Sequence, residues 1–122
     1  RTLAYLPDID KWEKWESWSQ EGAPDAVPRR VESMIESVDL ALLDGCFFAD
    51  GEIAGRTMKE IPHPFIAESI ERFRSMAPAQ RAKVFFTHLN HTNPAADEKS
   101  DAAHAVTAAG MHVLDEGHVF GL

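Results

Sequence analysis

One stretch of the chain, residues 83–94, combines a short apolar run with several side chains that can bind a metal or orient a substrate. His88 and His91 offer imidazole nitrogens, which are common ligands of divalent metals. The apolar run is bounded by turn-forming residues and predicts a buried strand, so both histidines lie at its carboxyl end, where α/β sheets usually place catalytic groups. Three more polar residues there can orient metal ligands, although capping and turn formation explain them nearly as well: Asn90, Thr92 and Asn93.

Two further predicted strands also end in a carboxylate. Residues 3–6 lead into Asp8, and residues 39–44 end in Asp44. Asp8 has an ordinary alternative as a turn or helix-capping aspartate. Asp44 follows four apolar residues, so its charge lies at the edge of a buried layer, where an unpaired carboxylate is costly. A cation bound at Asp44 would offset that cost.

Helical patterns separate these strands. Trp12, Trp15 and Trp18 recur every third residue, which suits one face of a short helix that packs or forms an interface; a stacking platform for a base or sugar is the alternative. The other helices are predicted over residues 27–38, from Pro64 onward, and over 97–109 with Gly110 as a left-handed cap, before a terminal hairpin of residues 111–114 and 119–120.

The segment between the second strand and the second long helix, residues 49–62, is a polar loop that contains glycine. Loops of this length are often functional, so Glu60 and the following His63 are candidates for binding substrate or orienting ligands. The complete order is β-α-β-α-β-α-β-β, which predicts an α/β fold with one sheet and its helices in a single domain over residues 1–122.

Composition restricts the classes of partner. The net charge is −8, with 20 acidic and 12 basic residues, which argues against a nucleic-acid partner. No apolar run is long enough to span a membrane, so a cytoplasmic protein is the default expectation. A single cysteine, Cys46, excludes an internal disulfide and a thiolate zinc cluster, which leaves His, Asp and Glu as the expected metal ligands. Because the chain begins at Arg1 and enters a strand at once, we expect it to be a fragment.

Four segments occur in a recognisable order: YLPD at residues 5–8, LLDGCFF at 42–48, GRTM at 55–58 and THLNHTNP at 87–94. Together they resemble the C-terminal half of the PqqB branch of the metallo-β-lactamase superfamily, and the similarity covers essentially the whole chain. The resemblance implies one sheet-plus-helices lobe of an αββα sandwich. The chain would then be the C-terminal lobe of a longer protein whose N-terminal lobe is absent.

The resemblance also implies a metal site that this chain shares with the missing lobe. By position, Asp44 matches the superfamily's late metal-binding aspartate and His88 its last histidine, whereas the His-x-His-x-Asp-His cluster of the N-terminal lobe does not occur here. Two ligands fall short of the three usual in catalytic zinc sites. The chain alone is therefore expected to be inactive, to bind metal weakly or not at all, and to associate, including as a homo-oligomer.

Two departures from the PqqB pattern bear on activity. Glu60 stands where PqqB has a histidine, and His91 stands where PqqB commonly has asparagine, which suggests a sister group with another small-molecule substrate. His91 is equally consistent with a substrate contact, an auxiliary ligand or a role outside the ligand shell. The resemblance implies a hydrolase using water activated by a divalent metal, zinc first and iron or manganese next. A non-haem iron oxygenase in cofactor biosynthesis and a non-catalytic interaction lobe are the alternatives.

Overall fold

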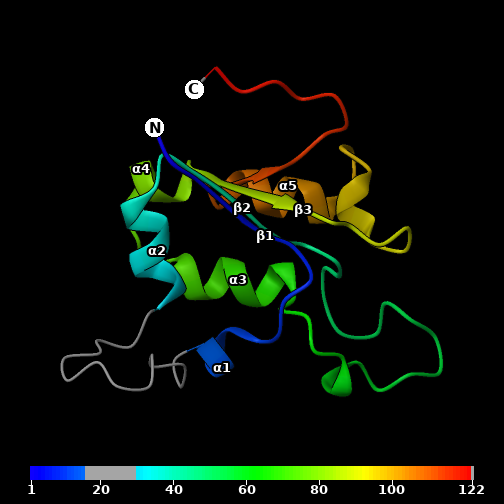
Figure 1. Cartoon of the computed structure of the whole chain (residues 1–122). Helices are drawn as coiled ribbons and strands as arrows, with labels where there is room; N and C mark the ends of the chain where they lie inside the picture. Colours follow the sequence, from blue (N-terminus) through cyan, green and yellow to red (C-terminus); the bar gives the residue numbers. More distant parts are fainter. Residues whose placement is uncertain (16–29, 122) are drawn as a thin grey trace.

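The computed structural model describes residues 1–15 and 30–121, which form one sheet with helices packed on it (Figure 1). Within these residues no helix is both long and apolar enough to cross a membrane. The elements in chain order are β1 (Leu3–Leu6), α1 (Trp12–Trp15), α2 (Val31–Ser37), β2 (Leu40–Asp44), the 3-10 helix η1 (Met58–Glu60), α3 (Ile66–Phe73), α4 (Pro78–Arg81), β3 (Val84–Thr87), the 3-10 helix η2 (Pro94–Ala96), α5 (Asp101–Ala108) and β4 (His112–Val113).

The sheet has four parallel strands in the order β1-β2-β3-β4, which confirms the predicted α/β class. The register places Leu6 beside Leu43, Leu43 beside Phe86, and Phe86 beside Val113. Parallel strands joined by helical crossovers all point the same way, so the residues that follow β1, β2 and β3 meet at one edge of the sheet. That edge carries the polar residues singled out in the sequence.

One face of the sheet forms the hydrophobic core with the helices. Leu43 and Phe86 on this face are fully buried, together with Ile35 of α2, Ile66 of α3 and Val106 of α5. The apolar positions of α2 and α3 recur with helical spacing, and their buried residues meet those of α5 over these strands. The helices therefore hold the strand ends in fixed positions from one side.

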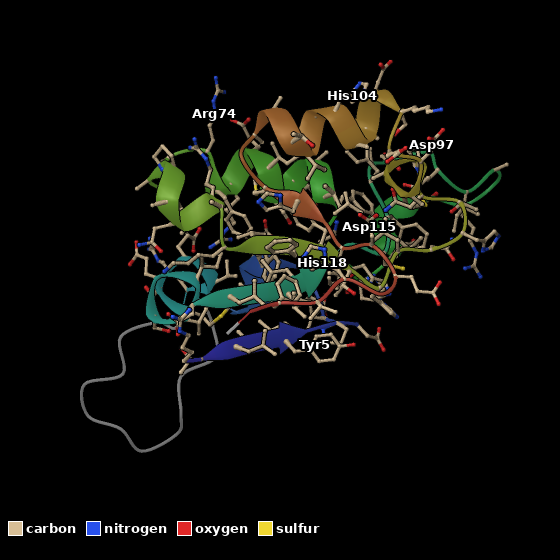
Figure 2. The ribbon with its side chains drawn as sticks, turned by 90° about the horizontal axis from the view of Figure 1, so that it is seen from above. Tyr5, Arg74, Asp97, His104, Asp115 and His118 are labelled. Atoms are coloured by element: carbon tan, nitrogen blue, oxygen red, sulfur yellow. The ribbon has the colours of Figure 1, made fainter. Side chains whose placement is uncertain are left out.

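The other face of the sheet is covered less completely. Its central row is Tyr5, Leu42, Phe85 and His112, one residue from each strand. Tyr5 is 60% exposed. His112 stacks on Phe85 with ring centroids 4.4 Å apart. Figure 2 shows the C-terminal segment crossing these strands, so only part of this apolar face has a partner within the described residues.

The predicted terminal hairpin is wrong in its second strand. β4 pairs in parallel with β3, and residues 119–120 lie outside any strand. The chain does turn near Gly117, which has a φ of 82°, but it then passes over the open face instead of returning beside β4. Phe120 packs edge-on against Phe85, with ring centroids 5.0 Å apart, so side-chain contacts take the place of strand pairing.

The first tryptophan of the predicted stripe is a core residue. Trp12 is 2% exposed, lies 6.0 Å from Phe73 between ring centroids, and donates from Nε1 to Ser69 Oγ at 2.8 Å. These contacts confirm the packing role for Trp12 and exclude it from a stacking platform. The side chain of Trp15, the whole of Trp18 and the predicted helical start at Val27 lie outside the described residues.

Replacement of Ser69 by alanine is expected to destabilise the chain by about 1 kcal/mol. The substitution removes the acceptor of the buried Trp12 indole N–H, and an unpaired buried donor costs about that much or more. Urea unfolding followed by tryptophan fluorescence measures the loss. Ser37→Ala is the matched control, because the Ser37 hydroxyl is exposed and donates to the Met34 carbonyl of its own helix; equal losses in both variants would contradict the buried bond.

Candidate metal centre

The carboxyl ends of three adjacent strands bring Asp8, Asp44 and His88 to one edge of the sheet, as the sequence predicts. Asp8 and His88 each adopt a positive φ, of 54° and 60°, directly beyond their strands. Residues other than glycine seldom occupy this region, and they stay there only where the surrounding structure holds them. Backbone turns at these two residues thus aim their side chains from fixed positions.

Asp44 is completely buried, and N–H groups satisfy its carboxylate. Oδ1 accepts from the Cys46 backbone N–H at 2.8 Å, and Oδ2 accepts from the Ile9 backbone N–H at 2.9 Å. Oδ2 also lies 2.7 Å from His63 Nδ1. The sequence predicted that a bound cation would offset the cost of burying this charge. In the structure, N–H groups of the protein offset it.

Asp44 fixes the orientation of His63. The imidazole comes from the loop before α3, is 15% exposed, and donates its Nδ1–H to the carboxylate in the tautomer that this contact favours. The second ring nitrogen, Nε2, then carries the lone pair and lies 3.6 Å from Asp8 Oδ1. A carboxylate that holds the far side of an imidazole in this way is the usual support of a histidine metal ligand.

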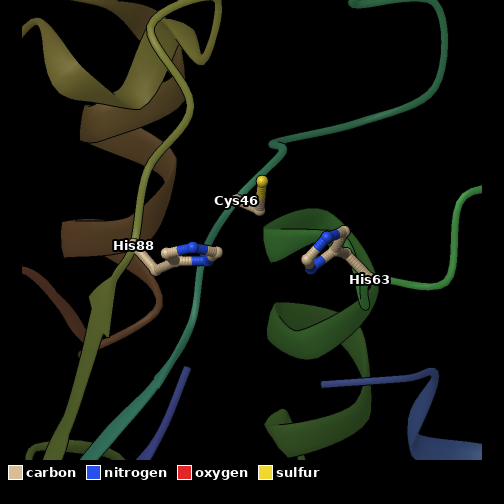
Figure 3. Close-up of side chains that lie close together, drawn as sticks. All are labelled: Cys46, His63 and His88. Carbon is tan, nitrogen blue, oxygen red and sulfur yellow. The ribbon is translucent and has the colours of Figure 1, made fainter. Parts of the chain in front are cut away.

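Three candidate ligand atoms lie together beyond Asp44. The ligand atoms of Cys46, His63 and His88 lie within 4.8 Å of one another, and Figure 3 shows the three side chains around one space. The His63 and His88 ring centroids are 5.9 Å apart. One thiol and two imidazoles form a donor set that suits zinc and similar divalent metals. This group, which we call the Cys–His cluster, could hold a metal ion.

Cys46 is 9% exposed, and its surroundings disfavour the thiolate. Burial, together with the nearby carboxylates of Asp44, Glu52 and Asp8, raises the pKa of the Cys46 thiol to about 11. Metal binding at this residue is thus coupled to loss of a proton, as it is for cysteine ligands in general. Without a metal, Cys46 is a protonated thiol at neutral pH.

The sequence analysis missed Cys46 as a candidate ligand and assigned His63 only to a supporting role or to substrate binding. Cys46 has no metal-binding neighbour in its own segment, and His63 lies 25 residues before His88 in the chain. A signal was available in the position of Cys46, two residues past the end of β2 and at the same edge as the other strand ends.

Asn93 is a structural residue of the site. It is 3% exposed, and its Nδ2 donates to the Gly45 carbonyl at 2.7 Å and to the Cys46 carbonyl at 3.3 Å. Its Oδ1 accepts from the Ala95 backbone N–H at 2.9 Å and caps η2. Of the two interpretations given by the sequence, capping is therefore the observed one, and Asn93 fastens the segment after β3 to the turn that carries Cys46.

The other predicted residues surround the cluster without joining it. Asn90 donates from its backbone N–H to the Cys46 carbonyl at 2.9 Å, and its Nδ2 donates to Thr92 Oγ1 at 2.7 Å. Thr92 Oγ1 in turn lies 3.2 Å from Glu52 Oε1. His91 is exposed and lies outside the three-residue cluster. The structure thus places His88 in the Cys–His cluster and His91 outside it.

A hollow of about 500 Å³ opens next to the Cys–His cluster. Cys46 and His63 form one side of it, and Glu60 lines it as well. Ligand pockets of small molecules commonly have volumes in this range and a mostly apolar lining with a few polar groups. The remaining lining residues are Phe47, Ile53, Arg56, Thr57, Ile61 and Pro62.

Replacement of Asn93 by aspartate is expected to cost about 2 kcal/mol. The carboxylate keeps the cap on η2, but an acceptor oxygen then faces the carbonyl oxygens of Gly45 and Cys46, which lose their donor in a buried position. Thermal unfolding compared with the original chain measures the cost. Asn90→Asp, at a partly exposed position, is the control, and an equally large loss there would show that the Asn93 contacts are not special.

Comparison with known proteins finds relatives of one kind. Coenzyme PQQ synthesis protein B of Nitrosococcus oceani is 33% identical over 92 residues, which cover 71% of this chain and 30% of that protein. The protein of the same name from Methylobacterium nodulans is 28% identical over an alignment of 125 positions, which covers 96% of this chain and 36% of that protein. The one from Xanthomonas euvesicatoria is 27% identical over 97 residues, with 75% of this chain and 32% of that protein covered. No protein-family model matches the chain.

The chain spans about a third of the length of the curated relatives that it matches. The similarity nevertheless extends over most of this chain in all three cases, and it includes the residues between β2 and β3 in the alignment that covers 96% of the chain. The comparison and the quoted sequence motifs thus agree on the same resemblance.

Proposed function

We propose that this PqqB-like chain is the C-terminal part of a metal-dependent hydrolase of the metallo-β-lactamase superfamily. The observation that carries the proposal is the meeting of Asp44, His63 and His88 at the carboxyl edge of a parallel sheet, in a chain similar to PqqB proteins. The names of the relatives support a role in the synthesis of coenzyme PQQ or in a related conversion of a small molecule.

The shape of the sheet supports a place in a larger sandwich. In the described part of the chain, the helices of the core pack on one face of the sheet. On the other face, Leu3 is 48% exposed and Tyr5 is 60% exposed. A sheet with one helix-covered face and one apolar face can pack on a second sheet, as an αββα sandwich requires. The partly uncovered face is therefore proposed as the side that meets the rest of the protein.

Each residue of the site has a defined task under this proposal. His88 and His63 present ring nitrogens toward one space, and Asp44 keeps the His63 Nδ1 protonated so that Nε2 is available. A bound divalent metal would supply a hydroxide near neutral pH, because it lowers the pKa of its water to about 7. The neighbouring hollow of about 500 Å³ receives a small substrate, with Glu60 and Arg56 as charged contacts on its wall. Direct metal binding by Asp44 stays a prediction, since its observed contacts act on His63.

The test uses the complete gene product that contains this chain. We expect the protein to contain about one zinc ion or more per chain and to hydrolyse at least one member of a panel of esters and lactones. The His88→Ala variant should lose both the metal and the hydrolysis. His104→Ala, at an exposed site on α5, is the control and should keep both. Iron together with oxygen consumption would overturn the hydrolase in favour of an oxygenase, and a metal-free, inactive protein would favour an interaction lobe.

A further inference from the structure

We infer that Cys46, His63 and His88 form a three-ligand metal site within this chain, selective for a thiophilic divalent ion such as zinc or cobalt. The inference rests on the proposed function for the presence of a metal, and it adds Cys46 to the two histidines, His63 and His88, that the proposed function places at the metal. It reverses the expectation that the chain contributes only two ligands and cannot bind metal alone.

The first argument is distance. The ligand atoms of the cluster lie within 4.8 Å of one another. In a tetrahedral zinc site with bonds of about 2.0–2.3 Å, two ligand atoms are about 3.3–3.8 Å apart. A shift of at most about 1–1.5 Å therefore closes the site, and the exposed side chain of His88 has room to make it.

The second argument is that the protein already holds two of the three ligands in place. The Cys46 backbone N–H bonds to Asp44, and the Cys46 carbonyl accepts from the backbone N–H of Asn90. His63 is fixed through its Nδ1 by Asp44, whereas the exposed side chain of His88 is the one that moves to complete the site. Ligands fixed in this way lose little conformational entropy when a metal binds.

The third argument is the chemical character of the set. Thiolate ligands favour zinc and other soft ions, whereas magnesium, calcium and manganese prefer carboxylate, carbonyl and water oxygens. Three protein ligands with an open fourth position match the usual arrangement of a catalytic zinc site. Asp8 Oδ1, 3.6 Å from His63 Nε2, adds the negative charge of an exposed carboxylate next to the site.

The test is cobalt titration of the purified 122-residue chain, because cobalt reports its ligands by absorption. We expect one cobalt ion per chain, a thiolate-to-cobalt charge-transfer band in the near ultraviolet, displacement of cobalt by zinc, and no displacement by magnesium. Cys46→Ser should abolish the band. His63→Ala and His88→Ala should each weaken cobalt binding at least tenfold, and His104→Ala should leave it unchanged.

Two results would overturn the inference. One is the absence of cobalt binding by the folded chain, with folding verified by circular dichroism; the other is a charge-transfer band that persists in Cys46→Ser. Neither result bears on the proposed hydrolase, whose metal can draw ligands from elsewhere in the complete protein. Conversely, if this chain binds cobalt but the complete protein has no hydrolase activity, the metal site stands and the proposed hydrolase function is wrong.

Discussion

Replacement of Asp44 by alanine should lower the free energy of unfolding by about 3 kcal/mol or more. Three donors lose their acceptor at once, namely the backbone N–H groups of Ile9 and Cys46 and the Nδ1–H of His63. Each donor left without a partner in a buried position costs about 1–3 kcal/mol, and water can reach only the more open ones. Urea unfolding at neutral pH measures the change.

Two further variants make the Asp44 result specific. Asp39→Ala removes the carboxylate that precedes the same strand, where an exposed Oδ2 accepts from the Thr2 backbone N–H at 2.7 Å, and should cost clearly less. If the Asp44→Ala variant does not fold, Asp44→Asn takes its place, because asparagine keeps the shape of the side chain. Asp44→Asn should still weaken cobalt binding tenfold or more, because His63 loses the negative charge that supports it. If Asp39→Ala and Asp44→Ala lowered the free energy of unfolding equally, the three buried hydrogen bonds to Asp44 would contribute no more than one exposed hydrogen bond.

Replacement of Gly45 by alanine is expected to cost about 3 kcal/mol. An added Cβ would lie 2.9 Å from Phe86 Cβ, 3.1 Å from the Thr87 carbonyl oxygen and 3.3 Å from Ile66 Cδ1. Two of these neighbours belong to β3 and cannot move without shifting the strand, so overpacking is near the upper end of its usual range. Thermal unfolding gives the loss in stability, and cobalt affinity should fall in parallel because Gly45 separates Asp44 from Cys46.

Gly121→Ala is the matched control for the Gly45 substitution. A Cβ added at Gly121 meets nothing within 4 Å, so the stability should change by less than about 0.5 kcal/mol. If Gly45→Ala changed the stability as little as Gly121→Ala, the turn of residues 44–46 would not pack against β3 as closely as the structure shows. Gly45→Ala and Gly121→Ala together therefore test the position of the turn of residues 44–46 independently of any metal.

The sequence by itself determined the sheet and the edge that carries the site. Short apolar runs ending in turn residues located β1, β2 and β3, because a buried strand leaves that pattern in its own few residues. The same local pattern placed Asp8, Asp44 and His88 at strand ends. It failed at residues 119–120, which lie in no strand: Phe120 packs on Phe85 through its side chain, a contact that no local pattern records.

Only the tertiary structure decided which groups meet at that edge. His63 reaches Asp44 across 19 positions of chain, and the Ile9 N–H reaches it across 35, so the partners of the buried carboxylate depend on how the loop before α3 folds back on the sheet. The same folding brings the Cys46 thiol to two histidines that are distant in sequence. Strands are specified by neighbouring residues, whereas a ligand set is specified by distances between separate elements, and those distances exist only once the core has packed.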